Sequence, residues 1–418
     1  MAQITGHLGG GAMIVFVVLL ALRCLVQMNW LPAKGIGIKR LGREDGVCQP
    51  NAFSRREYAM VFAGALLLQW AVLFAAWLTL NQPGGLPQFL EHFQSRFTQA
   101  GDSPHYLSIA QNGYLPTGEA AKYIVFYPLY PLLIRLAGIF TGGNLPLAGL
   151  LVSQLCWGAS CVMLLRLASC WLSRENAVWA VAFMMVYPFA FFGMGIYTES
   201  LFLLLCISCV YQAVCRCWGV AGLLGGLAAL CRTQGLVMLL VVLWLLMRAQ
   251  KEKKQGLKSL GILLIPAGWA VYLGCNYVVF GNCFAFLEFE AAPPWYQTTC
   301  WIAENLTQHC QMAVDNPGLA NFIYWPQLAF YFIILGLLFW GLWQGVRTEW
   351  LIWGGAYLGM SYLAGWMISG PRYMLGCIPL FLLMARIPSK KVRTVLLIVS
   401  FLAQSSYTAL FMQGQAIM

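Results

Sequence analysis

Long apolar stretches alternate with short polar segments along almost the whole chain. An α-helix needs about 20 apolar residues to cross the hydrocarbon core of a bilayer, and a chain of this size with such stretches has room for about 11–13 membrane segments. The pattern therefore predicts an all-α, polytopic integral membrane protein. The apolar stretches cover residues 11–28, 59–80, 124–140, 147–169, 177–196, 198–217, 219–231, 235–248, 259–280, 326–346, 350–369, 373–387 and 394–413.

Composition leads to the same class of protein. Of the 418 residues, 60% are hydrophobic and only 9% are charged, whereas a typical soluble domain carries about 25% charged residues. These values exclude a soluble enzyme, a disordered chain and a disulfide-rich secreted module. In a soluble protein the net charge of +11 would suggest nucleic-acid binding, but Lys and Arg collect in the cytoplasmic loops of membrane proteins. We therefore expect membrane lipids as partners and no nucleic acid.

Basic residues give an orientation for the predicted segments. They cluster in segments 29–58, 248–258 and 386–393, which the positive-inside rule assigns to the cytoplasm. All three share one side only if the stretch 124–140 enters and leaves the membrane on the same face. Pro128 and Pro131 interrupt helical hydrogen bonding near its start, and broken backbone at membrane depth needs protein or a wet cavity beside it. We therefore predict a short, broken element next to a cavity.

This orientation leaves two larger loops on the outer side, 81–123 and 281–325. It also separates residues 1–58, an N-terminal membrane helix followed by a basic cytoplasmic loop, from a main transmembrane domain over 59–418. Cys300 and Cys310 lie in the second outer loop. A disulfide between them and two free thiols both remain open, with free thiols favoured.

The first outer loop contains a polar string at 101–114, Gly-Asp-Ser-Pro-His-Tyr-Leu-Ser-Ile-Ala-Gln-Asn-Gly-Tyr. Asp102, followed by Ser103 and Pro104, is typical of a helix start with Asp as the N-cap. The same carboxylate, at a water–membrane boundary, is also suited to deprotonate an acceptor hydroxyl as a general base. His105, about one turn further on, could bind an anionic group or form a hydrogen bond within the loop.

Three further charged residues lie at the ends of apolar stretches. Glu199 lies between two apolar stretches. Burying an acid at such a position costs free energy unless the acid is paired or lines a cavity. Arg232 is embedded between two short apolar stretches, and Arg372 lies at a predicted helix start; the predicted layout brings both to the outer side. The planar guanidinium fork of arginine suits phosphate, and a helix N-terminus also favours anions. Snorkelling arginines, or arginines paired with Glu199, are the structural alternatives.

Aromatic and proline residues form two more motifs. Residues 126–131 read Phe-Tyr-Pro-Leu-Tyr-Pro, and residues 293–296 read Pro-Pro-Trp-Tyr. Both could anchor the chain at the membrane interface, and Trp295 could equally stack on a sugar ring. On the predicted layout these residues share the outer side with the charged ones, which describes an outward cavity suited to an anionic, lipid-linked substrate.

The order of these motifs resembles the PIG-V family, the second mannosyltransferase of GPI-anchor assembly, and its prokaryotic relatives. The family's Trp-Asp-x-x-His-[Phe/Tyr]-Leu-x-Ile-Ala-x-x-Gly-Tyr string is matched except at its first position, where Gly101 replaces Trp. The N-terminal stretch 11–28 is an addition to the family pattern. The other matching positions are His105, Tyr106, Leu107, Ile109, Ala110, Gly113, Tyr114, Tyr127–Leu132, Tyr197, Glu199, Leu201, Arg232–Leu236, Pro293, Pro294, Trp295, Arg372 and Tyr373.

The resemblance implies a GT-C-type glycosyltransferase that moves mannose or another hexose from a polyprenyl-phosphate sugar to a glycan or glycolipid acceptor. Asp102 would be the general base of an inverting reaction on the outer or luminal face, in the plasma membrane or the endoplasmic reticulum. No metal or other cofactor is expected. The residues expected to bind the substrates or the donor phosphate are His105, Tyr106, Tyr127, Glu199, Arg232, Gln234, Trp295, Arg372 and Tyr373.

Two other classes remain open at this stage. A polytopic lipid or solute transporter, or a flippase, would share the composition, but transporters often show internal repeats and none is visible in this sequence. An oligosaccharyl or acyl transferase would share the architecture. A metal-dependent oligosaccharyl transferase should carry further acidic ligands beside Asp102, and the sequence shows none.

Overall fold

The computed structural model describes residues 1–31, 53–80, 84–365, 369–415 and 417. Within these ranges the chain is built from helices, and the one β-bridge joins Thr299 to Ala364. Seven helical stretches are long and apolar enough to cross a membrane, so the predicted all-α, integral membrane fold is confirmed. They are α1 (Ala2–Gln27), α2 (Arg55–Leu78), α6 (Leu145–Ser169), η4 with α10 (Thr233–Leu236, Val237–Glu252), η5 with α11 (Leu257–Leu263, Leu264–Phe280), η6 with α15 (Ala320–Tyr324, Trp325–Trp343) and α19 (Lys390–Met412).

Shorter helices complete the bundle. Two predicted stretches are not continuous helices. Residues 177–196 divide after α7, before Pro188, and residues 373–387 divide before Pro379, because proline cannot continue the helical hydrogen-bond ladder. The shorter elements in and beside the membrane region are α7 (Arg174–Met185), η3 (Ala190–Met194), α8 (Glu199–Val214), α9 (Trp218–Ala229), α16 (Thr348–Tyr362), α17 (Gly370–Tyr373), η7 (Met374–Gly376) and α18 (Ile378–Ala385).

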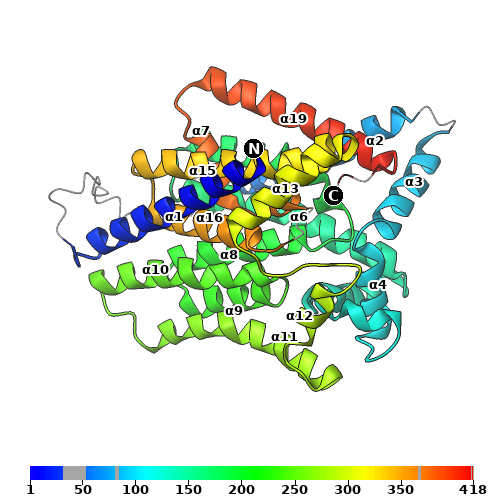
Figure 1. Cartoon of the computed structure of the whole chain (residues 1–418), viewed down its shortest axis with the longest axis horizontal. Coiled ribbons are helices and arrows are strands. Elements are labelled where there is room, and N and C mark those ends of the chain that lie inside the picture. Colours follow the sequence, from blue (N-terminus) through cyan, green and yellow to red (C-terminus); the bar gives the residue numbers. More distant parts are fainter. Residues whose placement is uncertain (32–52, 81–83, 366–368, 416, 418) are drawn as a thin grey trace.

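The long helices run roughly along the longest axis of the molecule (Figure 1), and basic side chains gather at one of its ends. There, Lys251 Nζ donates to the backbone oxygen of Gln27, and Lys390 pairs with Glu175 at 3.1 Å. Arg347 lies over the ring of Trp171. The predicted basic segments 248–258 and 386–393 therefore lie at the same end of the bundle (Figure 1). Most of the predicted loop 29–58 lies outside the described residues.

The predicted broken element is formed by η1 (Glu119–Val125), α5 (Leu129–Gly138) and η2 (Ile139–Thr141). Its two arms meet at 112°, and the chain bends at Tyr127-Pro128. The backbone N–H of Leu129 donates to the carbonyl oxygen of Leu230 at 3.4 Å. Such a contact satisfies polar backbone that a continuous helix would satisfy internally.

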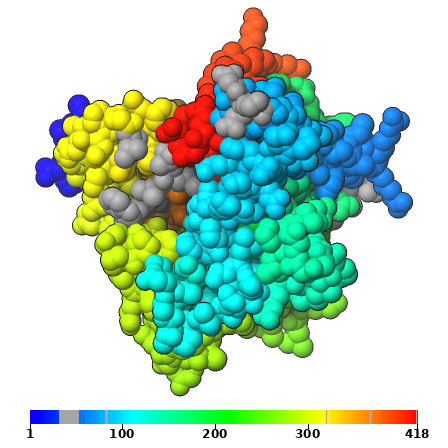
Figure 2. Space-filling model, turned by 90° about the vertical axis from the view of Figure 1, so that its right-hand side faces the viewer, coloured from blue at the N-terminus to red at the C-terminus, as the bar shows by residue number. Residues whose placement is uncertain are grey.

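The opposite end of the bundle carries the two larger loops. Figure 2, which faces this end, shows α3 and α4 at its centre and residues near 300 beside them. Phe89, Phe93 and Phe97, four residues apart, form the buried face of α3. Arg96 donates to the carbonyl oxygen of Phe411 at 3.0 Å, so α3 covers the last turn of α19. The helices of these loops are α3 (Leu86–Gln99), α4 (Ser103–Asn112), α12 (Ala285–Ala291), α13 (Ile302–Asp315) and α14 (Pro317–Leu319).

The N-terminal helix α1 packs along α13. A Cβ added at Gly6 would stand 2.3 Å from the carbonyl oxygen of Ala303, so glycine permits this close approach. At its other end, Arg23 is buried and donates to Thr348 Oγ1 at 3.1 Å and to the carbonyl oxygen of Val346. The N-terminal segment, which the sequence alone set apart as an addition, therefore holds α13 against the bundle.

Candidate active site

Asp102 lies in the turn between α3 and α4, and two hydrogen bonds to residues 196 and 197 hold this turn in place. The hydroxyl of Tyr197 donates to the carbonyl oxygen of Ala100 at 2.9 Å, and Ser103 Oγ donates to the carbonyl oxygen of Ile196 at 3.1 Å. Asp102 occupies the N-cap position, but its side chain makes no capping hydrogen bond. The carboxylate therefore points elsewhere than the capping interpretation requires.

Its partner is Arg372. The guanidinium Nη2 of Arg372 contacts Asp102 Oδ2 at 2.9 Å, and its Nε contacts Glu199 Oε1 at 2.6 Å. Arg232 Nη1 reaches the same Glu199 oxygen at 3.1 Å. The structure thus joins four residues from distant parts of the sequence into one network, which we call the charged network: Asp102, Glu199, Arg232 and Arg372.

Exposure differs sharply within the charged network. The side chains of Glu199 and Arg372 are 3% and 4% exposed and that of Arg232 is 12% exposed, whereas that of Asp102 is 29% exposed. The two arginines are thus not snorkelling residues, because a snorkelling side chain keeps its charged head in water. Asp102 is the member that solvent or a substrate can reach.

Each arginine is also held by aromatic rings. The Arg372 guanidinium lies 4.5 Å from the ring centroid of Tyr197 and 4.8 Å from that of Phe192, and Arg232 lies 4.6 Å from that of Tyr373. Cations over aromatic faces are attracted by the ring quadrupole, most strongly where water is excluded. Tyr373 therefore contributes to the site through its ring, as a support for Arg232.

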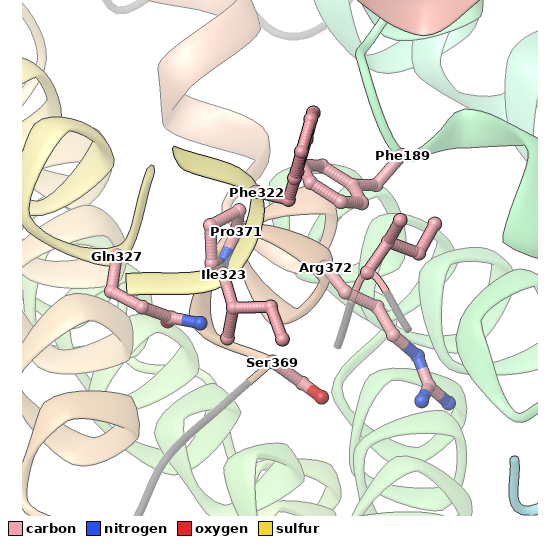
Figure 3. A pocket seen from close by; sticks show the side chains of 8 residues that line it. Phe189, Phe322, Ile323, Gln327, Ser369, Pro371 and Arg372 are labelled. Carbon is pink, nitrogen blue, oxygen red and sulfur yellow. The ribbon is translucent and has the colours of Figure 1, made fainter. Parts of the chain in front are cut away.

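The short helix α17 that carries Arg372 is anchored on both sides. The backbone N–H of Gly370 donates to Gln327 Oε1 at 2.8 Å, and the hydroxyl of Tyr187 donates to the carbonyl oxygen of Pro371 at 2.5 Å. A small hollow beside α17 is lined in part by Gln327, Pro371 and Ser369. In Figure 3 the Arg372 guanidinium points away from the phenylalanine rings of this hollow.

A group of aromatic rings lies next to Asp102. The His105 ring is 4.5 Å from Tyr123, 5.0 Å from Phe126 and 5.4 Å from Trp295, measured between centroids. His105 Nδ1 and Trp295 Nε1 are buried and have no hydrogen-bond partner in the structure. Burial lowers the pKa of His105, against the opposing charge of Asp102. His105 is therefore neutral at pH 7, which leaves hydrogen bonding as its means of contacting a ligand.

The remaining predicted residues lie at different depths around this group. Tyr106 is buried, with its ring 5.1 Å from that of Phe126. The Tyr127 hydroxyl is 2.6 Å from Thr233 Oγ1, and its ring stacks on Tyr272, so it links the broken element to the residue that follows Arg232. Gln234 is half-buried, and the described part of the chain provides no hydrogen-bond partner for its side-chain amide.

Glu290 was not identified from the sequence. It lies on α12, and its half-buried carboxyl forms no ion pair or hydrogen bond with the described residues. Burial raises the pKa of this carboxyl to about 7. A signal was available, because five of the six residues in the run 284–289 are aromatic or apolar, and Glu290 follows this run and precedes Trp295 closely.

The structure also answers two questions about the segment 281–325. Cys300 and Cys310 are free thiols, as the sequence favoured. Asn305, the first residue of an Asn-Leu-Thr sequon, is fully buried. Its amide nitrogen donates to the carbonyl oxygens of Tyr362 and Ala364 at 2.9 and 2.8 Å, so this asparagine joins α13 to the end of α16.

Comparisons with known proteins give a limited likeness. No protein-family model matches the sequence, and no curated protein is similar to it. Two solved structures are similar in backbone, both of oligosaccharyltransferases from Archaeoglobus fulgidus. One, in complex with Zn and sulfate, has 12% sequence identity and a TM-score of 0.48. The similar region covers 84% of this chain and 53% of the archaeal chain. The other, AglB with an inhibitory peptide and a dolichol-phosphate, has 13% identity, a TM-score of 0.48, and coverages of 86% and 56%.

The chain thus spans about half the length of these archaeal proteins. The function proposed below rests on the charged network and its surroundings rather than on this likeness.

Proposed function

We propose that the protein is a membrane glycosyltransferase that transfers a hexose, with mannose as the first candidate, from a polyprenyl-phosphate sugar to a glycan or glycolipid acceptor. The observation that carries the proposal is the charged network. It combines a carboxylate that solvent can reach with two buried guanidinium groups. The resemblance of the surrounding motifs to the PIG-V family supports the choice of sugar and donor.

The roles follow from the chemistry of each group. Asp102 accepts the proton of the acceptor hydroxyl, while the acceptor oxygen attacks the anomeric carbon and the bond from that carbon to the phosphate oxygen breaks. The reaction inverts the anomeric configuration, so a β-linked donor gives an α-glycoside. Arg232 and Arg372 stabilise the charge that develops on the leaving phosphate, as preorganised cations do in a site that excludes water.

Charge is conserved through this step. A polyprenyl-phosphate sugar is a diester with one negative charge, and the polyprenyl phosphate that leaves it is a monoester with about two at neutral pH. The proton that moves to Asp102 removes one negative charge from the carboxylate at the same time. The network and its substrates therefore keep the same total charge, and the reaction balances without a cofactor.

The aromatic group beside Asp102 supports an acceptor that carries a sugar ring. His105 and Trp295 each leave one buried ring nitrogen without a partner, and aromatic faces with hydrogen-bonding edges suit the apolar face and the hydroxyls of a sugar. His105 lies three residues after Asp102, on the same face of α4. An acceptor held there would have a hydroxyl close to the proposed base.

The proposed orientation assigns the basic end to the cytoplasm and the charged network to the outer or luminal side, in the plasma membrane of a prokaryote or the endoplasmic reticulum of a eukaryote. The positive-inside rule supports this assignment. Labelling of single engineered cysteines from outside intact cells tests it. Residues 101–114 should react and residues 248–258 should not, and the reverse pattern would overturn the orientation.

One transfer assay tests the activity. Purified protein is incubated with polyprenyl-phosphate-linked tritiated mannose or glucose and a set of glycosides and glycolipids, with Asp102→Asn as the paired variant. We expect transfer by the native protein, persisting in EDTA, and loss of transfer in the variant. No transfer to any acceptor, or full activity of Asp102→Asn, contradicts the proposal. Lipid or solute movement across vesicles without transfer would instead indicate a transporter.

A further inference from the structure

Glu199 is the buried centre of the charged network, and its chemistry does not fit direct binding of the donor phosphate. A carboxylate repels a phosphate, and this one is 3% exposed. Its Oε1 atom accepts from Arg372 Nε at 2.6 Å and from Arg232 Nη1 at 3.1 Å. Two guanidinium groups thus converge on one oxygen atom, although like charges so close together repel in a low-dielectric interior.

Arg372 is shared between two carboxylates. Its Nε contacts Glu199 and its Nη2 contacts Asp102, so Glu199 competes with Asp102 for a single positive charge. The strength of the pair between Arg372 and Asp102 sets how good a base Asp102 is, because a nearby cation favours the charged carboxylate.

We propose that Glu199 is a positioning residue with two effects. It holds Arg232 and Arg372 together at the place of the donor phosphate, and it limits how strongly Arg372 binds Asp102. This inference rests on the proposed function and adds a role for Glu199 that is separate from substrate contact.

The two effects predict opposite changes in Glu199→Gln. The amide keeps an oxygen that can accept from both arginines but removes one negative charge, so the site becomes more positive and binds the donor phosphate more tightly. The guanidinium of Arg372 then pairs more strongly with Asp102, which weakens the base. We expect the KM for the donor to fall about threefold and kcat to fall about tenfold, within the range that a positioned base contributes. The acid limb of the pH–rate profile should move to lower pH.

A matched control exists at the basic end. Glu349 is also a buried carboxylate, 1% exposed. Its Oε1 atom lies 2.5 Å from Arg347 Nε, and its Oε2 atom lies 3.8 Å from Arg248 Nη1. Glu349→Gln makes the same chemical change at the other end of the bundle. It should leave the KM for the donor and the pH profile unchanged, even where it lowers stability. Glu199→Asp, which restores the charge, should return the acid limb toward that of the native protein.

A second measurement does not depend on turnover. A water-soluble carbodiimide labels protonated carboxyls, so the labelling of Asp102 against pH, read by mass spectrometry, reports its protonation directly. In Glu199→Gln the labelling curve should move to lower pH. An unchanged curve, or a raised donor KM with unchanged kcat, overturns the positioning role. If the native protein transfers no sugar while the curve still moves, the proposed function fails, and of the two effects only that of Glu199 on Asp102 stands.

Discussion

Asp102→Asn separates the catalytic role of Asp102 from its structural one. The substitution keeps the size of the side chain but removes the basic oxygen and the negative charge. In the native protein that charge pairs with Arg372 Nη2 at 2.9 Å, and the carboxylate is 29% exposed. Arg372 keeps its contact with Glu199 in the variant. The structure therefore predicts a large loss of activity with a small loss of stability.

The two magnitudes are well separated. A partly exposed ion pair contributes up to about 1 kcal/mol, so the apparent melting temperature in detergent should move by only a few degrees. A positioned general base contributes about 10²–10⁴ in rate, which is about 3–5 kcal/mol of transition-state stabilisation at about 1.4 kcal/mol per factor of ten. Glu199→Ala should show the opposite balance, with a large loss of stability. Removing this carboxylate breaks a buried ion pair, which costs about 3–5 kcal/mol.

The assay measures initial rates of transfer from the polyprenyl-phosphate sugar together with thermal unfolding of the same preparations. The donor KM of Asp102→Asn should stay within a few fold of the native value, since the arginines remain. Transfer within threefold of the native rate would show that Asp102 is not the base. A loss of activity accompanied by a loss of stability as large as that of Glu199→Ala would show a structural role instead.

Three further predictions concern His309 and Asn305, which both lie on α13. Burial lowers the pKa of His309 to about 4, so stability should fall as the pH drops from about 6.5 toward 4, and less so in His309→Gln, as thermal unfolding across pH will show. Asn305→Ala leaves two carbonyl oxygens unpaired, those of Tyr362 and Ala364, and should cost about 2–4 kcal/mol in the same assay. Expression in a glycosylating host should leave Asn305 unmodified, which mass spectrometry checks.

Much of the fold follows from hydropathy and charge. Apolar length located the spanning helices, because a bilayer demands a minimum run of apolar residues. The prolines at 128 and 131 located the break, and the structure bends there by 112°. What hydropathy did not show is where an apolar run stops being one helix. Around Pro188 and Pro379 the buried chain turns within protein, and apolar composition is the same on both sides of such a turn.

The site was predictable in its members but not in its contacts. An acid or an arginine inside an apolar sequence stands out because it needs a partner, and this signal marked Glu199, Arg232 and Arg372. Their pairing depends on how helices from three parts of the chain pack, which no local pattern encodes. Glu290 was missed for a related reason. Its segment reads as a loop, whereas the structure forms a short helix there, α12, whose Phe286 packs on Tyr272 of α11.

The arrangement of the charged network is better explained by function than by stability. Burying charges is costly, and apolar residues of similar volume often replace a buried ion pair without loss of stability. Here the protein buries two guanidinium groups near each other and offsets them with one fully buried carboxylate, leaving the second, Asp102, where solvent can reach it. This asymmetry leaves an accessible carboxylate beside two largely buried cations, an arrangement that fits the proposed transfer from a phosphate-linked donor to a hydroxyl.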